Sequence, residues 1–145
     1  MATNKGYASW KGLLKEGSGT LSTQSKVLDA GYSFASRFGE DNTWTNPEEL
    51  IAAAHAACFS MFLASLLEKE NYKPEDISTT VTAQLSKDET GPFISKLHVD
   101  TEGKVPGIAE EDFIRFAEKA KENCPVSRAL KSVPDMTLTA SLRPG

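Results

Sequence analysis

The pattern of hydrophobic and polar residues is dominated by one long apolar segment near the middle of the chain. From Leu50 to Leu67 the sequence has almost no polar residue and is rich in Ala, the best helix former. Asn46 can cap a helix, Pro47 suits the first helical position, and Glu49 follows three residues after Asn46, as in a capping box. The segment therefore predicts a helix from 46 to 70, buried on most of its sides.

Three strands are expected before this helix, over residues 5–38. The first centres on residues 7–14, and glycines at 17 and 19 separate it from a second over 19–25. In residues 32–38, aromatic or small residues alternate with polar ones, which is the period of a strand. This alternation predicts a third strand with Arg37 on the face opposite the aromatic residues.

Elements of both kinds are expected after the helix. Residues 76–87 alternate most clearly and predict a strand that returns over 93–101 as a hairpin. An amphipathic helix is expected over 108–123, a short helix over 126–131 after Pro125, and a last strand over 136–142. The order predicts an α+β fold in a single domain, residues 1–145.

Composition excludes several classes of protein. The net charge of -4 and the pI near 5.2 leave no basic excess for binding nucleic acid. The N-terminus lacks the apolar core of a signal peptide. The apolar helix contains His55, Ser60 and Ser65, and its ends are acidic, so we expect a buried core helix, no membrane partner and a cytoplasmic protein. With two histidines and two distant cysteines, no ligand cluster for a metal is expected.

The two cysteines, Cys58 and Cys124, stand 66 positions apart, too few for the disulfide framework of a small secreted domain. Cys124 precedes Pro125 at the start of the predicted short helix, where free N–H groups favour a thiolate, although a loosely capping buried thiol fits equally well. Cys58 lies in the apolar helix, where burial should raise its pKa unless a cation is near. It is either an inert core thiol or a reactive one with a positive partner.

Two residues are candidates for that partner. His55 lies one helical turn from Cys58, although a satisfied core histidine is the commoner case, and Arg37 stays charged in any surroundings. Glu48 lies ten residues before Cys58, or about 15 Å along a helix, and cannot touch that thiol within one straight helix. It could reach the Cys58 of a second chain across a two-fold axis, or it could be an ordinary first-turn glutamate.

Two motifs identify a resemblance. The segments TNPEELIAAAHAACFSM (45–61) and ENCPVSRAL (122–130) resemble the OsmC/Ohr family of thiol-dependent hydroperoxide reductases, and shorter matches extend the resemblance over nearly the whole chain. The sequence around Cys58 is similar to that of the OsmC branch. The Ohr branch carries its arginine near the N-terminus, where this chain has only lysines, so the match of Arg37 is also a branch assignment.

The resemblance implies a role for each of four residues. Cys58 is expected to attack the peroxide O–O bond, and Cys124 to condense with the resulting sulfenic acid to a disulfide. Arg37 is expected to hold the thiolate and polarise the peroxide, and Glu48 to orient Arg37. The family also implies an intertwined homodimer with active sites between its subunits, and an external dithiol reductant, possibly of lipoyl type.

The expected function is therefore the reduction of organic hydroperoxides, and of hydrogen peroxide less well, in oxidative and osmotic stress defence. No cofactor is implied. Apolar side chains near the thiol would bury the peroxide tail, and Phe38, Phe59 and Phe62 are the candidates. The alternative is a dimeric protein without catalytic activity that binds a small ligand or senses redox state through its cysteines.

Overall fold

The computed structural model describes residues 1–144, and these divide into two compact units, 1–50 and 51–144. The boundary falls inside the long helix α2 (Pro47–Lys69), so one continuous helix links the units. The expectation of a single domain stays a prediction.

The first unit is built on an antiparallel sheet in the order β1-β2-β3, as predicted. Its strands are β1 (Gly6–Lys11), β2 (Ser18–Thr23) and β3 (Asp29–Tyr32). Gly19 faces the ring of Tyr32, where an added Cβ would lie 2.5 Å from a ring carbon, so only glycine allows this aromatic residue to lie flat across the sheet.

The predicted third strand was wrong at its C-terminal end. The strand ends at Tyr32, and Arg37 lies on a short helix, α1 (Phe34–Phe38). Ser33 caps this helix by accepting a hydrogen bond from the backbone N–H of Ser36, while the Ser33 N–H donates to Ser36 Oγ. Phe34 and Phe38 are four residues apart and pair with ring centroids at 5.1 Å, a contact that a helix provides.

Helix α2 begins as predicted, with Asn46 Oδ1 accepting from the Glu49 N–H at 2.8 Å. Within the single chain its fully buried stripe recurs every four residues, at His55, Phe59, Leu63 and Leu67. The opposite face stays apolar and open, and Met61 is 76% exposed. The predicted burial of this helix on most of its sides is therefore found on one face only. Helix α2 is long and apolar enough to cross a membrane, but its buried stripe packs in the core of this chain.

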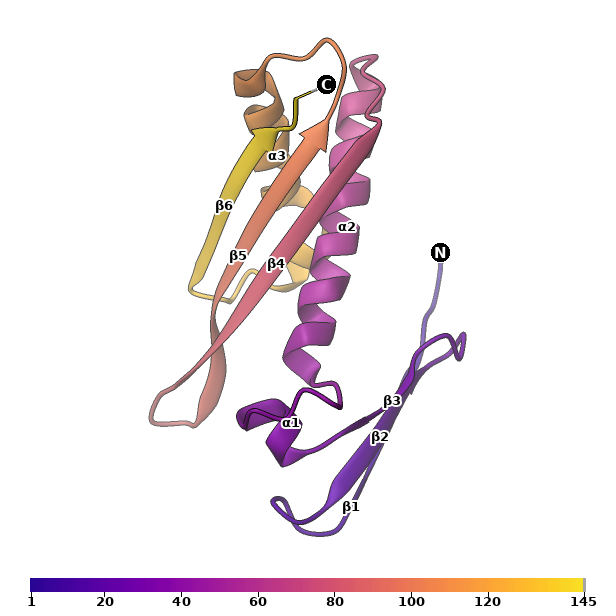
Figure 1. The fold of residues 1–145 in the computed structure, drawn as a ribbon, viewed down its shortest axis with the longest axis vertical. Coiled ribbons are helices and arrows are strands. Elements are labelled where there is room, and N and C mark those ends of the chain that lie inside the picture. Colours follow the sequence, from indigo (N-terminus) through magenta and orange to yellow (C-terminus); the bar gives the residue numbers. More distant parts are fainter. Residues whose placement is uncertain (145) are drawn as a thin grey trace. The chain divides into compact units, whose positions relative to one another are not determined.

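The second unit contains a sheet in the order β4-β5-β6, drawn in Figure 1 with α2 and α3 behind it. Strands β4 (Asp76–Lys87) and β5 (Pro92–Lys104) form the predicted hairpin, and β6 (Asp135–Leu142) runs parallel to β5. The parallel strand requires a crossover, which α3 (Glu110–Asn123) and α4 (Pro125–Ala129) supply.

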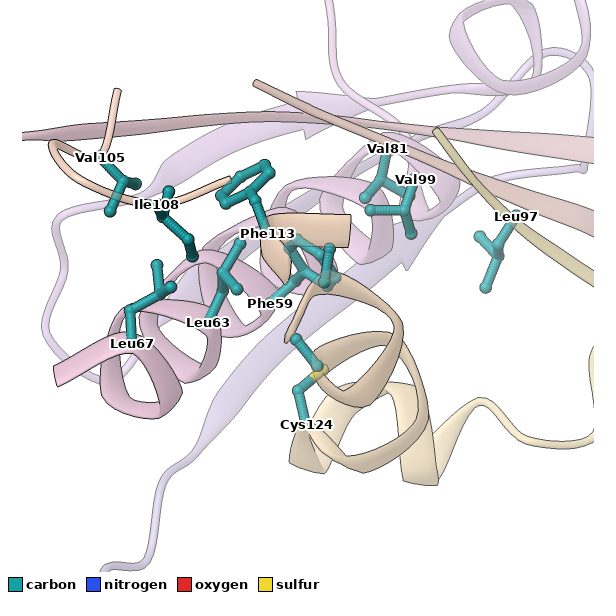
Figure 2. Close-up of a cluster of buried hydrophobic side chains, with 12 residues drawn as sticks. Phe59, Leu63, Leu67, Val81, Leu97, Val99, Val105, Ile108, Phe113 and Cys124 are labelled. Carbon is teal, nitrogen blue, oxygen red and sulfur yellow. The ribbon is translucent and has the colours of Figure 1, made fainter. Parts of the chain in front are cut away.

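The core of this unit lies between α2, α3 and the inner face of the sheet (Figure 2). Val81 and Val99 are paired across β4 and β5, and Phe59 and Leu63 face them from α2. Burying each such large apolar side chain is worth roughly 1.5–3 kcal/mol. Phe113 of α3 packs where β5 has Gly103, since a Cβ there would lie 2.6 Å from the Phe113 ring.

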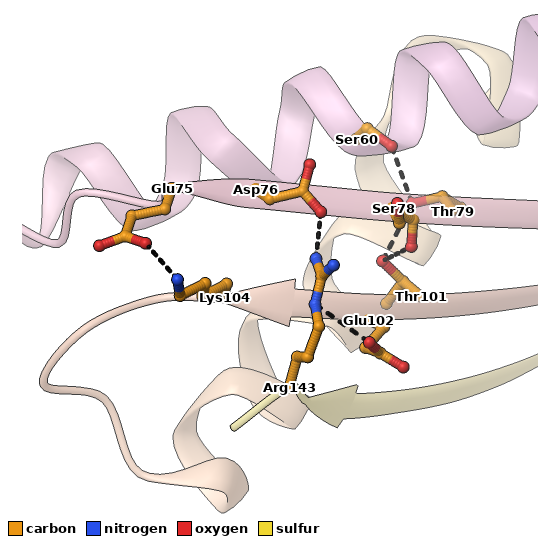
Figure 3. Close-up of polar contacts among 9 residues, drawn as sticks. All are labelled: Ser60, Glu75, Asp76, Ser78, Thr79, Thr101, Glu102, Lys104 and Arg143. Atoms are coloured by element: carbon orange, nitrogen blue, oxygen red, sulfur yellow. Dashed lines mark hydrogen bonds and ion pairs between the residues drawn. The ribbon is translucent and has the colours of Figure 1, made fainter. Parts of the chain in front are cut away.

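Polar contacts fix α2 and the strand ends to the sheet (Figure 3). Ser60 Oγ donates to Thr79 Oγ1 at 2.8 Å, and Thr79 Oγ1 lies 2.9 Å from Thr101 Oγ1, so hydroxyl groups satisfy one another beneath the helix. At the far end of the sheet, Arg143 pairs with the carboxylates of Asp76 and Glu102. These pairs join β4, β5 and the chain that follows β6.

Candidate active site

The structure assembles the predicted site residues into two groups, one in each unit. In the first unit, Arg37 of α1 pairs with Glu48 in the first turn of α2. Arg37 Nε donates to Glu48 Oε1 at 3.0 Å and to Oε2 at 3.3 Å, and Arg37 Nη2 donates to Oε1 at 2.8 Å. One edge of the guanidinium is thus held side-on by one carboxylate. Among residues 1–144, no hydrogen-bond partner is found for Nη1.

Neighbouring hydrogen bonds position this pair. Ser36 Oγ donates to the Thr45 carbonyl at 2.7 Å, and Asn46 Nδ2 donates to the Ser36 carbonyl at 3.1 Å, so α1 is tied to the start of α2. The Glu48 side chain is 9% exposed, whereas the Arg37 side chain is 40% exposed. The carboxylate is therefore fixed, and the cation keeps an open side, over the ring of Phe38 at 5.0 Å.

In the second unit, Cys58 on α2 and Cys124 between α3 and α4 meet, and both are free thiols. Burial is the main cause that raises the pKa of the Cys58 thiol, as predicted, and the charge and hydrogen bond of Cys124 raise it further. The backbone N–H of Val126 lowers the pKa of Cys58 and so opposes these effects. Cys58 is half-buried and Cys124 completely buried.

Cys124 caps α4, which confirms the predicted N-cap position. Its sulfur accepts from the Ser127 N–H at 3.3 Å and lies 3.0 Å from Ser127 Oγ. Ser127 Oγ in turn lies 2.7 Å from His55 Nε2. His55 therefore contacts Ser127, which fits the commoner case of a satisfied core histidine, and among the described residues no hydrogen bond joins it to Cys58. Burial lowers the pKa of His55, which keeps the imidazole neutral near pH 7.

Sequence reasoning did not identify Ser127. The signal that could have found it is its position, three residues after Cys124, where the N–H of a first-turn residue bonds to the N-cap side chain. A hydroxyl at that position lies beside the capping sulfur.

The three predicted pocket phenylalanines have different surroundings. Phe38 is exposed beside Arg37, Phe62 is half-buried against the core, and Phe59 is fully buried within it. Complete burial favours a core role for Phe59, and the contact of all three with a peroxide stays a prediction. Within residues 1–144, no group of three or more metal-ligating side chains is found.

Comparison with known proteins gives one consistent result. The family model described as OsmC-like protein matches residues 39–139. The chain is 46% identical to the peroxiredoxin OsmC of Escherichia coli over 96% of each sequence. Its fold is similar to that of an organic hydroperoxide resistance protein from Elizabethkingia anophelis, with a TM-score of 0.77, 25% identity and coverage of 99% of this chain and 98% of that one. A Legionella pneumophila organic hydroperoxide resistance protein OsmC has a TM-score of 0.74 and 27% identity, covering 97% of this chain and 99% of that one.

Proposed function

The chain belongs to the OsmC family, and from this premise we propose that it reduces organic hydroperoxides through Cys58 and Cys124. It is a thiol-dependent peroxidase, and its relatives carry the names peroxiredoxin and organic hydroperoxide resistance protein. The observation that carries the residue assignment is the meeting of Cys58 and Cys124 as free thiols, from positions far apart in the sequence.

In the proposed first step, the Cys58 thiolate attacks the peroxide O–O bond, the alcohol leaves, and Cys58 becomes a sulfenic acid. A buried thiol whose pKa is raised needs a cation to form this thiolate. Arg37 of a second chain is the proposed cation: Glu48 holds it in place, and its Nη1, which has no hydrogen-bond partner among the described residues, is free to bind the thiolate and the peroxide. The exposed ring of Phe38 gives an apolar tail a surface beside that cation.

In the second step, Cys124 attacks the Cys58 sulfenic acid, and a disulfide and water form. Before oxidation the two thiols lie close enough for Cys124 to raise the pKa of Cys58, so the chain holds the attacking group beside its target. An external dithiol, of lipoyl type, then reopens the disulfide by thiol–disulfide exchange. No metal or other cofactor takes part in these steps.

We further infer an intertwined homodimer in which the Arg37–Glu48 pair of one chain serves Cys58 of the other. The pair stands at the start of α2, and Cys58 follows Glu48 by ten residues, about 15 Å of helix. The open face of α2 supports a partner chain, because its residues are small or apolar. They are Ala53, Ala54, Ala57 and Met61. The proposed setting is one domain acting in cytoplasmic defence against oxidative and osmotic stress.

The test treats reduced protein with excess cumene hydroperoxide and measures peroxide consumption and free thiols. The wild type is expected to lose both thiols to an internal disulfide, and Cys58→Ser to consume no peroxide above the uncatalysed background. Cys124→Ser should oxidise Cys58 without forming the internal disulfide. If the peroxide persists and Cys58→Ser behaves as the wild type, the protein binds or senses small molecules and is no peroxidase.

A further inference from the structure

Beyond the two thiols, a buried chain of hydrogen bonds leads away from Cys124. Cys124 Sγ lies 3.0 Å from Ser127 Oγ, and Ser127 Oγ lies 2.7 Å from His55 Nε2. Cys124 and His55 are fully buried and Ser127 is 4% exposed. Because these three side chains are buried, Ser127 Oγ is an acceptor that a proton leaving Cys124 can reach without water.

The donors and acceptors of this chain can be arranged in only a few ways. In the arrangement that a proton relay requires, the Cys124 S–H donates to Ser127 Oγ, the Ser127 O–H donates to His55 Nε2, and the imidazole proton lies on Nδ1. If each proton moves one bond along, Cys124 becomes a thiolate that accepts from Ser127 O–H, and His55 Nε2–H donates to Ser127 Oγ. The same two contacts hold both states, and in the second state His55 carries a positive charge.

His55 Nδ1 is buried and has no hydrogen-bond partner among the described residues. The positively charged imidazolium of His55 is therefore poorly stabilised. This suits a group that takes a proton briefly and returns it. Burial lowers the pKa of His55, with no charged neighbour among the causes. The titratable groups that meet this chain are Cys58 on α2 and Cys124 before α4.

We propose that Ser127 and His55 form a proton relay that activates Cys124 for attack on oxidised Cys58; this rests on the proposed peroxidase function. The Cys124 proton passes to Ser127 Oγ while the Ser127 proton passes to His55 Nε2. The Cys124 thiolate then attacks Cys58 Sγ, the Cys58 S–O bond breaks and the S–S bond forms. The departing hydroxide takes the proton that His55 carried and leaves as water, so Cys124 is oxidised, the Cys58 sulfenic sulfur is reduced, and the charge balances.

Ser127 touches the reacting sulfur and is the catalytic residue of this step, while His55 is a positioning residue that acts through it. The test adds one equivalent of cumene hydroperoxide to the reduced full-length chain. Stopped-flow peroxide consumption follows Cys58 oxidation, and the loss of dimedone-reactive Cys58 follows disulfide formation. In Ser127→Ala and His55→Gln, we expect disulfide formation near pH 7 to slow on the order of 100-fold, with sulfenic acid accumulating at Cys58.

The pH profile separates a relay from a structural role. In Ser127→Ala the relay cannot take the Cys124 proton and hydroxide must act as the base, so the difference in rate from the wild type should narrow as pH rises. A defect of equal size at every pH overturns the relay. Ser127→Thr and Ser127→Val share one shape and differ in the hydroxyl, so the Thr variant should be much faster. Equal rates in that pair also overturn the relay.

Ser132→Ala is the matched control, because Ser132 is exposed in the same unit and should resolve at the wild-type rate. Far-UV circular dichroism and the rate of Cys58 oxidation show whether each variant folds. If His55→Gln does not fold, the comparison of Ser127→Thr with Ser127→Val still tests the relay. If the wild type itself neither consumes peroxide nor forms the disulfide, the proposed function fails. If it does both and Ser127→Ala keeps the wild-type rate, only the relay fails.

Discussion

Two groups of polar residues in this molecule are constructed in opposite ways. Arg37 and Glu48 form a charged pair whose cation stays 40% exposed. Cys124, Ser127 and His55 form an uncharged chain that is almost completely buried. Both groups are held by hydrogen bonds of about the same length, so burial and charge are what distinguish them.

The difference follows from the cost of burying charge. An unpaired ion in a protein interior is expensive, whereas neutral donors and acceptors that satisfy one another are not. The thiols lie in the core, where a permanent cation would be costly, and the permanent cation is kept on a partly exposed helix with a fixed carboxylate. In the proposed homodimer, assembly brings that charge to Cys58 only when the site is complete.

Removing the charge of Arg37 should give the largest effect. Arg37→Ala is expected to keep the fold and to slow Cys58 oxidation on the order of 100- to 1000-fold near neutral pH. Burial raises the pKa of Cys58, so without the cation its thiolate forms only at higher pH, and the defect should shrink as the solution becomes alkaline. Stopped-flow oxidation rates against pH provide the measurement.

Arg115→Ala is the control for this variant, since Arg115 is 71% exposed on α3 and belongs to neither group. It should oxidise Cys58 at the wild-type rate. An Arg37→Ala rate close to the wild type at neutral pH would remove the cation from the mechanism and leave the buried chain to act alone.

The elements that the sequence predicted well are long and periodic. The central helix, the hairpin and α3 each extend over more than ten residues, so one ambiguous position changes little. Residues 34–38 are too short for this averaging. Phe34 and Phe38 are an even number of residues apart, as a strand face requires, and also four apart, as a helix face requires, and the Ser33 cap decides for the helix.

The candidate site was predicted in part for a similar reason. Cys58, Cys124, Arg37 and Glu48 were singled out by their chemistry and spacing, and their roles by resemblance. The N-cap position of Cys124 was predicted from the proline that follows it. The contact of His55 with Ser127 joins positions 72 residues apart. No local pattern encodes such a contact, because it depends on how α4 packs against α2.

A substitution of Glu48 tests whether the positioning of Arg37 matters as well as the charge of Arg37. Glu48→Gln keeps the shape but removes the charged acceptor of Arg37 Nε and Nη2, so Arg37 should be less well positioned. We expect Cys58 oxidation to slow about tenfold, less than in Arg37→Ala because the cation remains. Glu49→Gln is the matched control, since the neighbouring Glu49 is exposed and bonds to Thr45. Equal rates in the two variants would show that Arg37 needs no carboxylate.

The smallest expected effect concerns the stability of the buried chain. Burial lowers the pKa of His55 from the ordinary 6.5, so below that pH the unfolded chain binds a proton that the folded chain does not. Stability rises with pH wherever the unfolded state binds more protons, so this contribution is complete above pH 6.5 and is lost as pH falls. Urea unfolding at about pH 7 and about pH 5.5, above the titration of ordinary carboxyl groups, should show a lower midpoint at the lower pH.

His55→Gln should flatten this dependence even if it lowers stability at both pH values, because the slope reports the titrating group and the offset reports the packing. His98 is the matched control, since it lies on β5 beside Thr137 and Thr139 and outside the buried chain. His98→Gln should keep the wild-type slope. If His55→Gln also keeps the wild-type slope, the fold does not hold the imidazole neutral. The buried chain could then no longer be contrasted with the charged pair as an uncharged group.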